Sequence, residues 1–132
     1  MDHKDSLGNS GKLNDGDVQW MTAGSGILHQ EMPLGNYKGE MHGFQLWANL
    51  PSNLKMTDPN YQDIKSSDIK VINDDDGTII KIIIGNYRGY KGLIKGIASN
   101  PQYFDIYVPP NKIKNFPISL RCLLYTSDAA DE

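Results

Sequence analysis

The chain has 132 residues, with 13 lysines and arginines against 16 aspartates and glutamates and a formal net charge of −3. This size limits the chain to one domain or parts of two. Because it lacks the basic excess that binds phosphates or an anionic membrane surface, we expect no direct nucleic-acid contact and no membrane partner. No apolar run reaches the roughly 18 residues of a membrane span and no signal peptide is recognisable, which favours a cytoplasmic protein.

The first half of the chain is predicted to form short strands separated by turns. Thirteen glycines and seven prolines supply turn residues, and helical periodicity is nowhere convincing. The expected strands lie near the N-terminus and at residues 18–22, 27–32 and 43–50, of which the last is the most strand-like. Trp20, Phe44 and Trp47 fall within these segments, and we interpret them as core residues rather than as a substrate box. The fold class is therefore expected to be all-β.

A change in character at residues 51–67 indicates a connection between domains. Turn-forming residues dominate this segment, and residues 61–64 are compatible with one short helical turn. Further strands are expected at residues 69–72, 78–84 and 103–108. The residues between the first two of these strands, 73–77, read as the turn of a hairpin.

Three consecutive aspartates in that turn, residues 74–76, raise the possibility of a calcium site. An EF-hand loop places its acids at alternate positions and ends with a glutamate twelve residues in, a pattern this segment lacks. We therefore interpret the aspartates as a solvated turn.

His29 and Glu31 are the residues most suited to metal chemistry. Side chains two apart on a strand point to the same face, so these two project together while Gln30 turns away. Imidazole and carboxylate donors together suit Fe(II), Mn(II), Ni(II), Cu(II) or Zn(II). The spacing alone also fits an exposed or merely hydrogen-bonded pair. His3 and His42 are expected to be surface histidines rather than further ligands.

Residues 122–132 stand apart from the rest of the chain. They resemble the translation of a transposase adapter used to prepare DNA sequencing libraries, so we predict a non-native tail and assign it no function. Without this tail the chain has 13 acidic against 13 basic residues and no cysteine.

Three segments resemble the pirin family of cupin proteins. They are residues 3–9, 16–33 and 43–51, and the second, GDVQWMTAGSGILHQEMP, is highly specific. The match continues through residues 55–62, whereas residues 69–121 agree only loosely. The resemblance implies a partial, jelly-roll-like cupin β-barrel followed by the opening strands of a second barrel.

The same resemblance implies a division of the chain. Its expected parts are the remainder of an N-terminal cupin domain at 1–56, an interdomain linker at 57–68, the start of a C-terminal cupin domain at 69–121 and the adapter-derived tail at 122–132. Barrel edges left open by the missing strands would expose residues 79–84, so we expect the chain to aggregate readily.

Pirins bind one metal, usually non-haem iron, through three histidines and one glutamate. The resemblance places His29 and Glu31 at two of these ligands, and other divalent transition metals are possible at such a site. The remaining two belong to a His-Pro-His-Arg-Gly-Phe-Glu motif that would precede Met1 and occurs nowhere in this sequence. We therefore expect a fragment that lacks half of the metal site.

For the intact parent, the resemblance implies a quercetin 2,3-dioxygenase-type oxygenase that acts on a small aromatic, flavonol-like substrate. Glu31, besides binding the metal, would accept the hydroxyl proton of the substrate and so counts as catalytic. The alternative is a non-enzymatic, metal- or redox-sensitive transcription cofactor that binds regulator proteins. The fragment itself is expected to be inactive in either case.

Overall fold

Short β-strands make up nearly all of the regular structure. The computed structural model describes residues 1–35, 38–97 and 100–117; the predicted tail at 122–132 lies outside them. The strands are β1 (Asp2–Asp5), β2 (Ser10–Lys12), β3 (Val18–Thr22), β4 (His29–Met32), β5 (Asn60–Ile64), β6 (Lys70–Asn73), β7 (Ile79–Ile84), β8 (Asn86–Tyr87), β9 (Tyr90–Lys91) and β10 (Tyr103–Tyr107). Two 3-10 turns, η1 (Ser52–Leu54) and η2 (Ser66–Asp68), flank β5. Across the described ranges, no helix is long and apolar enough to cross a membrane.

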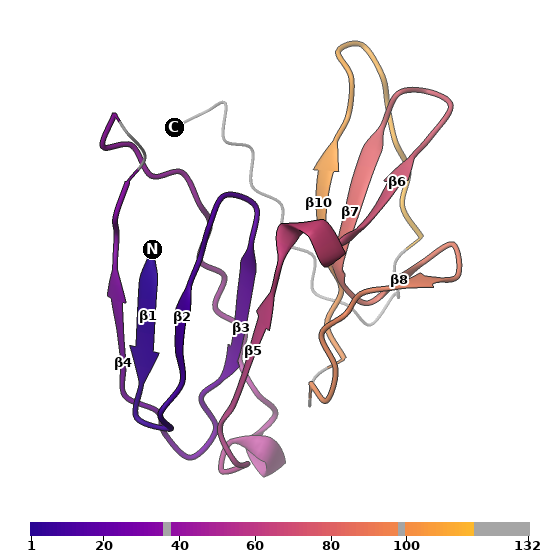
Figure 1. Ribbon diagram of the computed structural model, residues 1–132. Helices are drawn as coiled ribbons and strands as arrows, with labels where there is room; N and C mark the ends of the chain where they lie inside the picture. The colour runs from indigo at the N-terminus through magenta and orange to yellow at the C-terminus, as the bar shows by residue number, and fades with distance from the viewer. Residues whose placement is uncertain (36–37, 98–99, 118–132) are drawn as a thin grey trace.

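The strands pair antiparallel in small sheets. One sheet has the order β2-β1-β4, another the order β10-β7-β6, and the pairs β3-β5 and β8-β9 complete the set. Figure 1 shows β4, β1, β2, β3 and β5 on one side of the molecule and β10, β7 and β6 on the other. The predicted all-β class is confirmed.

The core is centred on β7, the central strand of its sheet. β-branched isoleucines suit a strand that is covered on both faces. Ile80 and Ile82 are fully buried and pack with Tyr87 in one cluster. Ile83 and Ile84 form a second cluster with Ile94, against which Val18, Trp20 and Ile64 of β3 and β5 pack. The second cluster therefore joins residues from the two halves of the chain.

A β-bulge near the end of β7 explains why Ile84 belongs to the second cluster. Tyr103 of β10 lies opposite Ile84 and Phe104 lies opposite Ile82, so Ile83 is an extra residue on β7. In a regular strand Ile84 would share a face with Ile82. The bulge re-aims the strand end, which lets Ile83 and Ile84 enter the same cluster.

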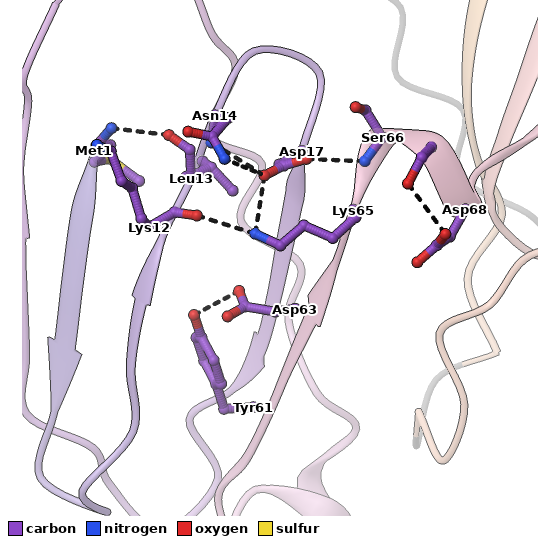
Figure 2. Close-up of polar contacts among 11 residues, drawn as sticks. Met1, Lys12, Leu13, Asn14, Asp17, Tyr61, Asp63, Lys65, Ser66 and Asp68 are labelled. Atoms are coloured by element: carbon purple, nitrogen blue, oxygen red, sulfur yellow. Dashed lines mark hydrogen bonds and ion pairs between the residues drawn. The ribbon is translucent and has the colours of Figure 1, made fainter.

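Asp17 ties the turn before β3 to the end of β5. Its carboxylate accepts hydrogen bonds from the backbone of Ser66 at 2.8 Å and of Asn14 at 3.1 Å, and Lys65 Nζ lies 3.0 Å away. Figure 2 shows Asp17 between these groups. Desolvation opposes ionisation of this carboxyl, but the hydrogen bonds and Lys65 outweigh it and lower the pKa of Asp17 from 3.8 to about 2.

Two secondary-structure assignments made from the sequence, one helical turn and one strand, are wrong. Residues 61–64 are not a helical turn, because they belong to β5 and pair with β3. Residues 43–50 form no strand, and Phe44 and Trp47 are 66% and 83% exposed, so neither is a core residue here. Trp20 alone of the three aromatic residues packs against the core.

In the second half of the chain, the predicted hairpin is confirmed, whereas the predicted solvation of Asp74 and the predicted open edge at residues 79–84 are wrong. The hairpin of β6 and β7 forms as expected, with Gly77 at a positive φ of 85°. Asp74 is not solvated, since its side chain is 5% exposed and makes ion pairs with Arg88 at 2.6 Å and with Lys114. Residues 79–84 are not an open edge either, because β7 pairs with β6 and β10. The predicted cause of aggregation is therefore absent.

We expect Ile80→Ala to lower the free energy of unfolding by about 2 to 5 kcal/mol, because it removes a fully buried side chain from the β7 core and leaves a cavity. Urea unfolding measures the loss. Ile113→Ala is the matched control: Ile113 is 89% exposed, so its loss should stay within about 0.5 kcal/mol. Equal effects of the two variants would contradict the placement of the core.

The lowered pKa of Asp17 predicts that the stability of the fold depends on pH. Its folded pKa is below the unfolded value, so its contribution is present above pH 3.8 and is lost as the pH falls towards 2. Asp17→Asn should therefore be less stable at neutral pH and should flatten this part of the stability curve, as measured by urea unfolding at several pH values. Asp15→Asn, an exposed neighbour, should leave the curve unchanged. A curve for Asp17→Asn that matches the unsubstituted chain would refute the assignment.

Candidate metal centre

The candidate site is built by the antiparallel pairing of β1 with β4. His3 lies directly opposite Glu31, and Asp5 lies directly opposite His29. Residues opposite one another in a sheet share a face, and so do residues two apart on one strand. The four side chains therefore form a block on one face, while the pair of Lys4 and Gln30 belongs to the other face. The predicted common face of His29 and Glu31 is confirmed.

Three potential ligand atoms meet in this block. One atom each from His3, His29 and Glu31 lies within 4.8 Å of the others. His29 Nδ1 is 3.6 Å from Glu31 Oε1, and the rings of His3 and His29 have centroids 5.9 Å apart. His29 and Glu31 keep 27% and 31% of their side-chain surface exposed, which leaves the cluster open to solvent on one side.

His3 is the buried member of the cluster. The residue is 2% exposed, and neither of its ring nitrogens has a hydrogen-bond partner among the described residues. An unsatisfied buried polar group costs about 1 to 3 kcal/mol, so a partner for this imidazole is to be expected. The expectation that His3 is a surface histidine is therefore wrong.

Tyr61 of β5 covers His3. The two rings stack with centroids 4.6 Å apart at 14°. The Tyr61 hydroxyl donates a hydrogen bond to Asp63 Oδ1 at 2.6 Å, as Figure 2 shows, and burial together with Asp63 raises the pKa of the phenol. Gly11 of β2 lies opposite His3, and a Cβ there would stand 2.5 Å from Asp63 Oδ2. The missing side chain at Gly11 thus makes room for Tyr61 and Asp63.

Asp5 stands beside both histidines as a fixed carboxylate. Its Oδ1 accepts hydrogen bonds from the backbone of Leu7 and Asn9, each at 2.9 Å, and its Oδ2 accepts one from Asn9 Nδ2 at 2.8 Å. Desolvation raises the pKa of Asp5, but these hydrogen bonds outweigh it and hold the pKa below its usual value. His3 Nε2 is 3.6 Å from Asp5 Oδ2, which is longer than a hydrogen bond.

The two carboxylate oxygens of Glu31 have different neighbours. Gln45 Nε2 donates a long hydrogen bond of 3.5 Å to Oε2, whereas Oε1 faces His29. His29 also borders a shallow surface hollow of about 310 Å³, whose lining includes Leu28 and Ser6 as well as Lys4 and Gln30 of the other face.

The donor set fits a divalent transition metal. Two imidazoles and one carboxylate are the ligands found around Fe(II), Mn(II) or Zn(II) in open protein sites. The unpartnered nitrogens of buried His3 support the fit, because a cation would satisfy one of them. His42 is exposed and lies outside this cluster, as expected.

Sequence reasoning missed His3 because its partner is distant in the chain. The spacing of His29 and Glu31 is visible within one strand, but His3 joins them only through the register of β1 against β4. The alternation of β1, in which His3 and Asp5 share a face, is the one local signal that pointed towards it.

Comparison with known proteins finds similar sequences and a similar fold. The family model described as Pirin matches residues 1–48. A pirin-like protein of Caulobacter vibrioides is 43% identical over 89% of this chain and 43% of its own length, and human Pirin is 43% identical over 89% of this chain and 39% of its own. The crystal structure of quercetin 2,3-dioxygenase from Acinetobacter baumannii is 41% identical with a TM-score of 0.64, over 80% of this chain and 38% of that one.

The all-β fold and the histidine–carboxylate cluster on paired strands define a cupin-type protein with a candidate metal centre. Within that class, the chain belongs to the pirin family. It spans less than half the length of each of these relatives.

Proposed function

We propose that His29 and Glu31 hold a divalent transition metal, Fe(II) in the first instance, in a quercetin 2,3-dioxygenase-type oxygenase. The observation that carries this proposal is the gathering of imidazole and carboxylate donors within 4.8 Å on one face of β1 and β4. Similarity to the Acinetobacter baumannii enzyme supports the reaction class. The proposal concerns the whole protein, because this chain spans 38% of that enzyme.

A metal bound here would act as a Lewis acid that polarises the ionised hydroxyl of a flavonol. Glu31 accepts the proton of that hydroxyl, and its 31% exposed side chain leaves it within reach of a substrate. Gln45 Nε2 lies 3.5 Å from Oε2 of Glu31 and leaves Oε1 on the side of His29.

A regulator-binding role is the second candidate. Within residues 41–47, four large apolar side chains are at least half exposed, and they are Met41, Phe44, Leu46 and Trp47. Exposed apolar groups of this kind are typical of surfaces that contact another protein. In that role the metal would control partner binding without turnover, and the partner would be a regulator protein rather than DNA.

For the whole protein loaded with Fe(II), we expect O₂-dependent loss of quercetin absorbance. Glu31→Gln should lower kcat by about 100-fold or more, because it removes the proton acceptor and weakens metal binding. His42→Gln is the matched control and should leave kcat unchanged, since His42 lies outside the cluster. The 132-residue chain alone should show no turnover.

Two results would decide against the oxygenase. Quercetin that persists in the presence of the Fe(II)-loaded protein and O₂ would refute it. Metal-dependent capture of a regulator protein without turnover would favour the second candidate instead. Full activity in Glu31→Gln would remove Glu31 from the catalytic role even if the reaction occurs.

A further inference from the structure

Residues 40–51 form an extended segment in which Gln45, Trp47 and Asn49 share one side. No turn or bend interrupts this segment. In an extended backbone, side chains two apart point the same way. The contacts of the two outer residues therefore indicate the direction in which the middle one, Trp47, is turned.

Both outer residues contact the rest of the molecule. Gln45 Nε2 lies 3.5 Å from Glu31 Oε2, and Lys55 Nζ donates a hydrogen bond of 2.6 Å to Asn49 Oδ1. Trp47 lies between these two contacts and on the same side of the segment. Its side chain is therefore on the side of the chain that faces Glu31 of the candidate centre.

Trp47 is nevertheless 83% exposed. The described part of the chain gives its indole no hydrogen bond and no ring contact, whereas the ring of nearby Phe44 has the ring of His42 5.6 Å away. Aromatic side chains dominate the contacts of small-molecule sites, together with a few polar groups that fix the orientation of the ligand. A bare indole beside a polar centre is a combination of this kind.

We propose that Trp47 is a substrate-contacting residue of the candidate centre, on which one ring system of the flavonol-like substrate stacks. The proposal rests on the proposed oxygenase and deepens it by naming a residue that determines its specificity. Two residues of extended chain span roughly 7 Å. A flat molecule that brings a hydroxyl to Glu31 and carries further rings is long enough to lie against Trp47 as well.

Two competing interpretations also explain an exposed indole. Trp47 either belongs to the surface for a regulator protein or packs against the remainder of the whole protein, of which this chain spans less than half. Neither interpretation requires contact between the indole and a flavonol. The three interpretations therefore differ in whether Trp47 affects flavonol binding.

The first test measures quercetin binding to the whole protein, loaded with Fe(II), freed of excess metal and kept without O₂. We expect Trp47→Ala to weaken binding about three- to tenfold, because it removes the stacking surface. With O₂ present, KM should rise by the same factor while kcat stays within about twofold, and the bound Fe(II) should not change. Trp47→Phe keeps an aromatic face and should restore most of the affinity. Met56→Ala, whose side chain is 77% exposed, is the matched control and should bind like the unsubstituted protein.

A second measurement does not depend on the folding of a variant. In the whole protein labelled with ¹⁵N at tryptophan and loaded with Zn(II), quercetin should shift the indole signal of Trp47. The signal of Trp20, which packs against the core, should stay in place. The signal that disappears in Trp47→Phe identifies the indole of Trp47.

Each outcome bears on one proposal. Equal quercetin affinity in Trp47→Ala and the unsubstituted protein, with an unshifted Trp47 indole, overturns the inference, and continued turnover then leaves the oxygenase standing. An unfolded Trp47→Ala variant together with an unshifted indole in the unsubstituted protein assigns Trp47 to packing and also overturns it. Weakened binding with a shifted indole supports the contact, and if turnover is absent the same result decides against the oxygenase alone.

Discussion

The register of β1 against β4 is the constraint on which the candidate site depends. It sets His3 opposite Glu31 and Asp5 opposite His29, so that four side chains able to bind or orient a cation occupy one face. Because strand side chains alternate between faces, a slip of one residue would turn His3 and Asp5 to the opposite side. The cluster would then be reduced to two residues of β4. The strand register therefore sets the positions of all four side chains at once.

Strands outside the β1–β4 pair enclose one side of the candidate site. Ile83, Ile84 and Ile94 pack against Trp20 of β3 and Ile64 of β5, which ties the β7 core to the β3-β5 pair. β5 then presents Tyr61, whose ring covers His3, while Gly11 of β2 leaves the space that Asp63 occupies. β5 therefore contacts the isoleucine core with Ile64 on one face and covers the buried imidazole with Tyr61 on the other.

Prediction from sequence succeeded where the signal was local. The alternation at His29 and Glu31, the hairpin of β6 and β7 and the all-β class all follow from patterns within a few residues. It failed where a segment needs a distant partner. Residues 61–64 became a strand because β3 pairs with them, and residues 43–50, although strand-like in composition, form no strand. The turn pattern predicts a solvated Asp74, but Arg88 and Lys114, which lie far along the chain, form ion pairs with it.

The sequence by itself determined the class of protein, the family resemblance and half of the candidate centre, since these depend on residue types and on spacing within single strands. Only the tertiary structure decided that His3 is enclosed, that Asp5 stands beside it and that Tyr61 stacks on it. Those facts depend on which strand lies next to which and in what register, and that choice is made by the burial of apolar groups over the whole chain. A histidine at position 3 is unremarkable in the sequence, and it joins the cluster of His29 and Glu31 only through its place in the sheet.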